Sequence, residues 1–467
     1  FCSHSDNAFE DLCRGGHMER TGDIKAYKLL SSAGAYWRGD ESNPMLQRIY
    51  GTAWESRDAQ KNYLRRRDEA EKRDHRKLGR SLGLFFFDPI APASPFFLPK
   101  GTHVINSLID YVKELYARYG YQEVITPQIF NTELWKRSGH LDAYAENMYF
   151  LDVDEREFGV KPMNCPAAAM LYLANSRSYR ELPIRMADFG RLHRNERSGV
   201  THGLNRVRSF VQDDAHIFCA FHQINAEITS FLQMLNESYK VFGFEKTRFE
   251  LSLRPEKRVG SDEMWDQAES ILTEVLDATG HKYTAQSGEG AFYGPKIDAF
   301  VPDAIGREWQ LGTVQLDFSL PERFDMEYTA ENGNRDRPVV IHRAMLGSLE
   351  RFLGVLIEHL SGAFPMWLSP VQVVIVPIAD RHNEFCFEVG KRISEAGFRV
   401  EVNDSNDRMN AKIRQAQLQK VPYMLVAGDR EVESQSLSVR TRSGDNLEPM
   451  SIDQVIDRFV KQVADRS

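Results

Sequence analysis

Two side chains with complementary chemistry lie two residues apart in the segment RMADFGRLHRNERSG, namely Arg194 and Glu196. In an extended backbone they would share one face, ahead of a glycine-containing turn and a second strand, RVRSFVQDDAHIF. A rigidly held arginine suits a phosphate bound through two hydrogen bonds, and the carboxylate beside it can accept from an exocyclic amine. The spacing alone equally fits a surface hairpin with ordinary salt bridges, because R-x-E is common.

A cysteine, Cys165, lies between two prolines in VKPMNCPAAAM. A free cysteine in such apolar surroundings is most often a small buried hydrophobic side chain. No second cysteine or histidine stands nearby at a metal-binding spacing. This segment alone therefore favours a structural cysteine.

Composition limits the class of protein. The 467 residues are enough for two or three domains. The formal net charge of −8 argues against nonspecific binding to nucleic acid, so any basic surface must be local. The five cysteines, with no C-x-x-C pair, predict a reducing compartment, which we expect to be the cytoplasm. No apolar run approaches the roughly 18 residues of a membrane span, and we expect no membrane association.

The pattern of elements predicts where these residues are held. Residues 55–80 consist mostly of charged helix formers and predict an exposed connecting helix. The Pro- and Gly-rich DPIAPASPFFLPKGTHV predicts a loop, followed by a helix that ends at Gly120. Short β-rich runs then alternate irregularly with helices, which indicates an α+β domain with a mainly antiparallel sheet. Beyond residue 369, apolar strands separated by helices indicate a small α/β domain with parallel strands.

Longer motifs carry a family resemblance. HRNE with RVRSFVQDDAHIF, and HRAMLGSLERF, resemble the second and third signature motifs of class II aminoacyl-tRNA synthetases, and YGYQEVITPQIF resembles the first. KPMNCP, RPEKRVGSDEMWD, GEGAFYGPKID and GTVQLDFSLPERF resemble the threonyl-tRNA synthetase family almost letter for letter. The resemblance runs from Asp11 to about residue 463. It implies a homodimeric enzyme that activates threonine with ATP and transfers it to the 3′ end of threonine tRNA.

The resemblance also implies four segments. Residues 1–54 would be a remnant of the editing domain and residues 55–83 a charged linker helix. Residues 84–368 would form the class II catalytic domain, on a mainly antiparallel sheet with flanking helices. Residues 369–467 would form the α/β anticodon-binding domain.

A metal site follows from the resemblance rather than from spacing. The family binds a catalytic zinc ion through residues that fall here on Cys165, His216 and His342. Three protein ligands leave zinc open for a substrate. The amino group and hydroxyl of threonine can fill the open positions, so the single zinc ion of each chain would select the substrate.

Other roles are carried over motif by motif. For ATP, the family places Arg194 on the α-phosphate, Glu196 on the adenine amine, Arg206 and Arg351 on the outer phosphates, and Gln310 on the strand against the nucleotide. Mg²⁺ is expected with ATP. Asp214, Tyr293 and Gln315 resemble residues that orient threonine. Lys296 and His140 resemble active-site positions, His140 near the tRNA terminal ribose. Asn406, Arg414, Glu431 and Arg440 match positions that contact anticodon bases, although each also fits an ordinary surface charge.

Two departures from the family keep an alternative open. Ala167 and Ala168 replace a glycine and a histidine beside Cys165, so we expect a reshaped pocket wall. Cys13 and His17 form only half of the hydrolytic editing site, so we expect no editing of seryl-tRNA by this chain. A specialised paralogue, either an inhibitor-resistant second copy or a non-catalytic RNA-binding regulator, would fit such changes.

Overall fold

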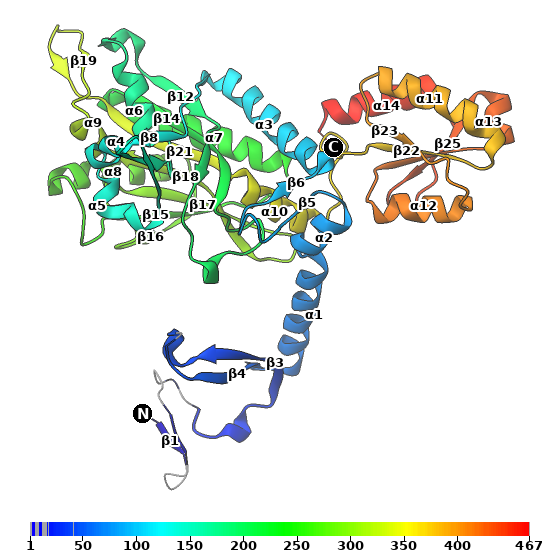
Figure 1. The fold of residues 1–467 in the computed structure, drawn as a ribbon, viewed down its shortest axis with the longest axis horizontal. Helices are drawn as coiled ribbons and strands as arrows, with labels where there is room; N and C mark the ends of the chain where they lie inside the picture. Colours follow the sequence, from blue (N-terminus) through cyan, green and yellow to red (C-terminus); the bar gives the residue numbers. More distant parts are fainter. Residues whose placement is uncertain (1, 5–8, 12–15, 17, 41, 467) are drawn as a thin grey trace. The chain divides into compact units, whose positions relative to one another are not determined.

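The computed structural model describes all residues except 1, 5–8, 12–15, 17, 41 and 467. Over this part of the chain it forms two compact units, Phe1–Lys72 and Arg73–Ser467, which are described separately below (Figure 1). None of the helices among the described residues is long and apolar enough to cross a membrane.

The first unit consists of antiparallel ribbons followed by a helix. Its strands are β1 (Cys2–His4), β2 (Phe9–Asp11), β3 (Ala26–Tyr36) and β4 (Met45–Trp54). β1 pairs with β2, and β3 pairs with β4 over most of their length. Helix α1 (Arg57–Arg73) then begins, and it buries none of its side chains.

The expected connecting helix is in fact two helices. The chain leaves the helical conformation at Asp74, whose carboxylate accepts a hydrogen bond from the backbone N–H of Arg76 and so caps α2 (His75–Ser81). Charge dominates α1, as expected, but α2 buries His75 completely. The expectation of one exposed helix over residues 55–80 was therefore wrong in two respects: the segment forms two helices, and His75 and Gly79 are buried.

Helix α3 (Pro99–Tyr119) begins earlier than the sequence predicts. Proline fits the first turn because its missing N–H has no partner there in any helix. Gly101 lies against the backbone of Leu84, where a Cβ atom would come within 2.0 Å of the carbonyl oxygen. The helix ends, as predicted, at Gly120, whose φ of 73° is left-handed. The Pro- and Gly-rich segment thus contains the short strand Phe96–Phe97 and, from Pro99, the start of the helix, so only its first part is a loop.

A nine-stranded, mainly antiparallel sheet forms the centre of the second unit within the described part of the chain. Its order is β16-β15-β17-β18-β21-β14-β12-β7, with β13 paired to β14. The strands are β7 (Gln122–Glu123), β12 (Ile184–Asp188), β13 (Arg191–His193), β14 (Ser209–Cys219), β15 (Arg248–Ser252), β16 (Tyr283–Gln286), β17 (Lys296–Pro302), β18 (Glu308–Asp317) and β21 (Val339–Ser348). The predicted α+β fold is confirmed.

Helices pack on this sheet through one large apolar core. They are α3, α7 (Ile224–Val241), α8 (Asp262–Ala278) and α10 (Leu349–Leu360). The sheet contributes a row of paired, fully buried side chains, Ile217, Ile341 and Leu316. Because side chains alternate along a strand, the residues next to them point to the opposite face of the sheet.

Shorter elements complete the part of the second unit that contains this sheet. The strands are β5 (Phe85–Phe86), β6 (Phe96–Phe97), β8 (Ile129–Asn131), β9 (Tyr149–Val153), β10 (Arg156–Val160), β11 (Arg177–Ser178), β19 (Tyr328–Thr329) and β20 (Arg335–Asp336). The helices are α4 (Thr132–Arg137), α5 (His140–Tyr144), α6 (Cys165–Leu173) and α9 (Ser319–Arg323).

The C-terminal part has a sheet of its own, of order β23-β22-β24-β25-β26. Its strands are β22 (Val373–Pro377), β23 (Val400–Val402), β24 (Tyr423–Ala427), β25 (Ser436–Thr441) and β26 (Met450–Ser451). Its helices are α11 (Asn383–Glu395), α12 (Met409–Leu418), α13 (Asp429–Ser434) and α14 (Ile452–Ala464). The first three strands pair in parallel, as predicted, whereas β25 and β26 add antiparallel pairs that the apolar pattern did not reveal.

Candidate active site

A row of polar residues crosses the central sheet on the face opposite the core. Lys296 pairs with Gln315, Gln315 with His342, and His342 with His216, along β17, β18, β21 and β14. Direct cross-strand partners project to the same face. Four residues that are distant in the sequence, all singled out there, therefore come together through the register of four strands.

Cys165 lies beside the two histidines of this row. It begins α6, and its sulfur lies within 4.8 Å of a ring nitrogen of His216 and of His342. The two imidazole rings are 4.8 Å apart at their centres and meet edge to face. The three residues proposed as metal ligands are thus brought together, and both histidines are buried.

Two ring nitrogens of these histidines have no hydrogen-bond partner among the described residues. His342 Nε2 lies 2.9 Å from Asp317 Oδ2, and a carboxylate accepts, so Nε2 carries a proton and Nδ1 is the nitrogen left for another partner. His342 Nδ1 and His216 Nε2 are both buried without a hydrogen-bond partner among the described residues. Sequence reasoning missed Asp317, which orients one ligand as carboxylates commonly do in metal sites.

The thiol is also suited to a metal ion. Burial raises the pKa of the Cys165 thiol, but the charges of His342 and His216 outweigh this effect and lower the pKa to about 7. A cysteine sulfur and two histidine ring nitrogens form a donor set that zinc prefers. The residues present therefore fit a three-ligand metal site.

Residues expected to bind threonine surround this cluster. The Tyr293 hydroxyl donates to Gln315 Oε1, and the Tyr293 ring centre lies 5.5 Å from that of His342. The Asp214 carboxylate accepts a hydrogen bond of 3.0 Å from Asn164 Nδ2. Asn164, just before the cysteine, is almost completely buried and was not identified from the sequence.

A second buried network fixes the segment that leads to Cys165. Lys161 is fully buried, and its ammonium donates to Thr126 Oγ1 at 2.8 Å and lies 3.4 Å from Asp188 Oδ2. Gly190 closes the network, because a Cβ atom there would come within 2.4 Å of Lys161 Nζ. These contacts fix the strand and turn that precede α6.

His140 and Lys296 lie next to the same site. His140, Cys165, Tyr293 and His342 share the lining of a cavity of about 40 Å³. Burial lowers the pKa of His140 to about 4, so its ring is neutral at pH 7, with Nδ1 2.8 Å from Ser138 Oγ. Lys296 Nζ pairs with Asp298 Oδ2 at 2.8 Å.

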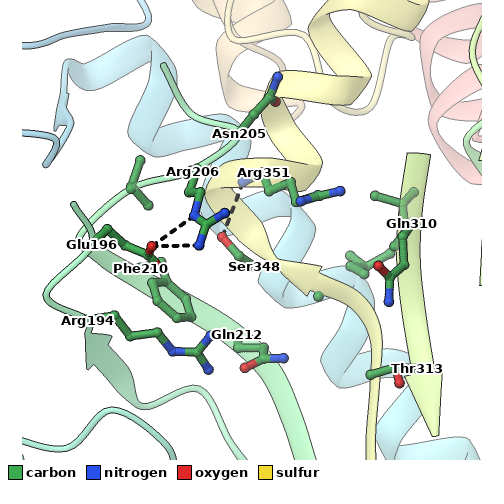
Figure 2. A pocket seen from close by; sticks show the side chains of 14 residues that line it. Arg194, Glu196, Asn205, Arg206, Phe210, Gln212, Gln310, Thr313, Ser348 and Arg351 are labelled. Carbon is green, nitrogen blue, oxygen red and sulfur yellow. Dashed lines mark hydrogen bonds and ion pairs between the residues drawn. The ribbon is translucent and has the colours of Figure 1, made fainter. Parts of the chain in front are cut away.

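A larger cavity of about 340 Å³ contains every residue expected to bind ATP (Figure 2). Those residues are Arg194, Glu196, Arg206, Gln310 and Arg351. Arg194 and Glu196 lie outside the strands, in the segment directly after β13. Their side chains nevertheless line the same cavity. Further lining residues that the sequence did not reveal include Asn205, Gln212, Thr313 and Ser348.

The charges of this cavity suit a polyphosphate. Three guanidinium groups and one carboxylate line it, and Arg206 Nε donates to Glu196 Oε2 at 2.9 Å. Burial lowers the pKa of Arg351, and the charge of Arg206 lowers it further. An anion placed between these arginines would replace their repulsion with attraction.

Asp213 fixes the backbone that forms part of the wall of this cavity. A bulge in β14 lies between Gln212 and Asp214, and the Asp213 carboxylate accepts the backbone N–H groups of the Met345–Gly347 segment. Gly347 has a left-handed φ of 74°, and α10, which carries Arg351, begins two residues later. Sequence reasoning missed Asp213.

The four residues expected to contact the anticodon come from four segments of the C-terminal part. Asn406 is exposed in the loop before α12, and Arg414 is exposed on α12. Glu431, on α13, accepts hydrogen bonds from Gly428 N and Ser438 Oγ. Arg440 lies on β25.

The two alanines lie in α6 and are buried. Ala168 belongs to an apolar cluster with Tyr172 and Phe218. Neither alanine is among the residues that line the two cavities above. Cys13 and His17, half of the expected editing site, lie outside the described residues.

Three parts of the chain match known protein families. Residues 149–360 match the tRNA synthetase class II core domain (G, H, P, S and T). Residues 372–462 match the anticodon binding domain, and residues 1–50 match the threonyl and alanyl tRNA synthetase second additional domain.

Relatives are similar over nearly the whole chain. Threonine–tRNA ligase of Bdellovibrio bacteriovorus is 52% identical over 457 residues, which are 98% of this chain and 70% of that protein. The Thermotoga neapolitana threonine–tRNA ligase is 52% identical over 98% of this chain and 72% of its own length. The chain belongs to the threonine–tRNA ligase family.

Solved structures agree with the ligase assignment. The RNA binding domain of threonyl-tRNA synthetase from Cryptosporidium parvum Iowa II superposes with a TM-score of 0.81 at 45% identity, over 83% of this chain and 98% of that one. A putative threonyl-tRNA synthetase from Aeropyrum pernix gives 0.75 at 30% identity, over 84% of this chain and 97% of that one. The class II fold and the expected ligase activity, with threonine, ATP and tRNA as substrates, are confirmed. The comparisons do not support the alternative of a specialised or non-catalytic paralogue.

Proposed function

We propose that Cys165, His216 and His342 bind one zinc ion per chain and that this ion recognises threonine. The observation that carries the proposal is a pair of buried imidazole nitrogens without partners, on two histidines that each have a ring nitrogen within 4.8 Å of the sulfur of Cys165. When bound, zinc would offer open positions to the amino group and the hydroxyl of the substrate.

Threonine would be oriented by the residues around the metal site. The Asp214 carboxylate suits the substrate ammonium, and the linked Tyr293 and Gln315 suit its polar groups. Asn164 holds Asp214 in place, and Asp317 holds His342. The substrate would therefore meet groups whose positions are already fixed before it binds.

ATP would occupy the cavity of about 340 Å³. Arg194 would contact the α-phosphate, Arg206 and Arg351 the outer phosphates together with Mg²⁺, and Glu196 the adenine amine, with Gln310 against the nucleotide. The hydrogen bond between Arg206 and Glu196 would open when both residues bind the nucleotide.

The two steps use positioning and charge stabilisation. The threonine carboxylate attacks the α-phosphorus, threonyl-adenylate forms and pyrophosphate leaves, with the arginines stabilising the displaced charge. The terminal ribose hydroxyl of the tRNA then attacks the acyl carbon and AMP leaves. His140 would lie near that ribose, neutral at pH 7 because burial lowers its pKa to about 4. Lys296 would contribute positive charge at the active site.

The remaining assignments concern organisation. Asn406, Arg414, Glu431 and Arg440 would contact anticodon bases, and two chains would associate through their catalytic domains. Residues 1–54 would belong to the editing domain, residues 55–83 would be the linker, residues 84–368 the catalytic domain and residues 369–467 the anticodon-binding domain. A metal-binding thiolate must stay reduced, which supports a cytoplasmic location.

This proposal can be tested by removing the metal ion and then adding it back. The purified chain should contain one zinc ion and catalyse ATP–pyrophosphate exchange that depends on threonine. A chelator should abolish both, and added Zn²⁺ should restore both. Full exchange activity in protein shown by metal analysis to lack zinc would refute the proposed role of the site.

A further inference from the structure

A histidine outside both cavities, His75, contacts the loop that carries part of the nucleotide site. It is fully buried at the start of α2. Its Nε2 accepts a hydrogen bond of 3.0 Å from the backbone N–H of Leu204, and its Nδ1 lies 2.6 Å from Glu358 Oε1. Because a backbone N–H can only donate, Nε2 is the unprotonated nitrogen and Nδ1–H donates to Glu358.

The same arrangement excludes a metal ion at this place. Asp74, His75 and Glu358 lie close enough for a three-ligand site. Both ring nitrogens of His75 are already used by protein groups, and the carboxylate of Asp74 accepts from Arg76. No lone pair of the imidazole remains for a cation, so the cluster is a hydrogen-bond relay.

The loop held by His75 leads directly into the nucleotide cavity. His202 and Arg206 pair in an isolated bridge, which makes the residues between them a tight loop. Leu204, at its tip, is fully buried. The next two residues, Asn205 and Arg206, line the cavity, as Figure 2 shows.

The other end of the relay lies on the helix that carries Arg351. Glu358 lies two turns further along α10, is 5% exposed, and also contacts the guanidinium of Arg307. Gly354 of this helix touches the loop, since a Cβ atom there would come 2.9 Å from Asn205 Oδ1. One helix thus presents Arg351 and anchors, through His75, the loop that presents Arg206.

We propose that His75 is a positioning residue for ATP: through its hydrogen bonds to Leu204 and Glu358 it holds Arg206 at the distance from Arg351 that the outer phosphates need. The inference rests on the proposed nucleotide site. Without a nucleotide the two guanidinium groups repel each other, as the lowered pKa of Arg351 reflects in part. The loop that carries Arg206 must therefore be held in place against this repulsion. The buried hydrogen bonds of His75 hold it.

The test measures ATP–pyrophosphate exchange with His75→Phe, which keeps a ring but removes both nitrogens. The KM for ATP should rise about tenfold, as expected for the loss of a buried hydrogen bond, while the KM for threonine stays within about twofold. His75→Gln should restore most of the loss, because its amide oxygen can accept from Leu204 N–H.

His382 offers a matched control. It is 2% exposed, its Nδ1 accepts from the backbone N–H of Ala379 at 3.1 Å, and its Nε2 lies 2.9 Å from Asp429 Oδ1. It lies in the C-terminal part, so His382→Phe should leave the KM for ATP unchanged. An equal rise in both histidine variants would show a general effect of losing a buried histidine and overturn the proposal.

A double-mutant cycle tests whether His75 affects ATP binding through Arg206. In an Arg206→Ala background, His75→Phe should add less than about twofold to the KM for ATP, because the group it positions is gone. A full additional tenfold would overturn positioning through Arg206 but leave the nucleotide site intact. An unchanged KM for ATP in Arg206→Ala alone would refute both the nucleotide site and this inference.

If His75→Phe does not fold, Gly203→Ala disrupts the contact between His75 and the loop by a change in the loop itself. A Cβ atom there would lie 2.2 Å from His75 Nε2, at a φ of 49° that disfavours alanine. The loop must then move away from His75, and the KM for ATP should again rise about tenfold. An unchanged KM in this variant would contradict the proposal.

Discussion

His216 and His342 are direct partners across β14 and β21, with their rings edge to face and 4.8 Å apart. Their neighbours Ile217 and Ile341 are partners on the other face, fully buried in the core. A slip of one residue would exchange an imidazole for an isoleucine and place polar nitrogens in the core. The hydrophobic core therefore fixes the register that brings the two proposed ligands together.

The cysteine assignment can be tested against a second thiol. Cys165→Ala should lose bound zinc and threonine activation, since two remaining ligands bind the metal too weakly. Cys219→Ala is the matched control, because Cys219 is a fully buried thiol on β14 whose pKa burial raises. It should keep one zinc ion per chain by elemental analysis. Retention of zinc by Cys165→Ala would return Cys165 to the role of a structural thiol.

Asp317 should tune the affinity of the metal site. Asp317→Asn weakens the partner of His342 Nε2, and such changes typically lower metal affinity by about 10- to 100-fold. Competition with a chromophoric chelator measures this. Asp303→Asn is the control, because Asp303 is also a buried carboxylate but its partners are Arg307 and Trp309. Equal zinc affinity in both variants would argue against the proposed orientation of His342.

Replacing Asn164 should change the KM for threonine and leave the KM for ATP unchanged. Asn164→Ala removes the hydrogen bond that holds Asp214, so we expect the KM for threonine to rise about five- to tenfold with an unchanged KM for ATP. Asn236→Ala, which removes a contact to His281, serves as the control in the same exchange assay. If the KM for threonine does not change in Asn164→Ala, Asp214 is not the group that orients the ammonium.

The metal site also predicts which substrates are rejected. Valine lacks the hydroxyl and would leave buried polar groups unpaired, so discrimination against it should reach about 10⁴-fold or more. Serine keeps the hydroxyl and lacks only a methyl group, a difference of about 10- to 200-fold. The ratio of kcat/KM values in amino-acid-dependent exchange gives both numbers. Activation of valine comparable to that of serine would rule out recognition through the hydroxyl.

The sequence predicted long elements well and side-chain partnerships poorly. β14 overlaps most of the predicted strand RVRSFVQDDAHIF but begins three residues later, at Ser209. The sequence predicts the start of α3 too late, because Pro and Gly favour loops, whereas Pro99 opens the helix. The proposed zinc ligands came only from family resemblance, since they meet through strand pairing that no local spacing reveals. Asp317 and His75 were missed for the same reason.

Anomalous scattering at the zinc edge, from crystals of the full chain grown with threonine, tests the central claim most directly. We predict one zinc peak per chain, about 2.0 to 2.3 Å from Cys165 Sγ and from ring nitrogens of His216 and His342, with the amino group and hydroxyl of threonine completing the coordination. A crystal with threonine bound and no zinc at these three residues would contradict the account.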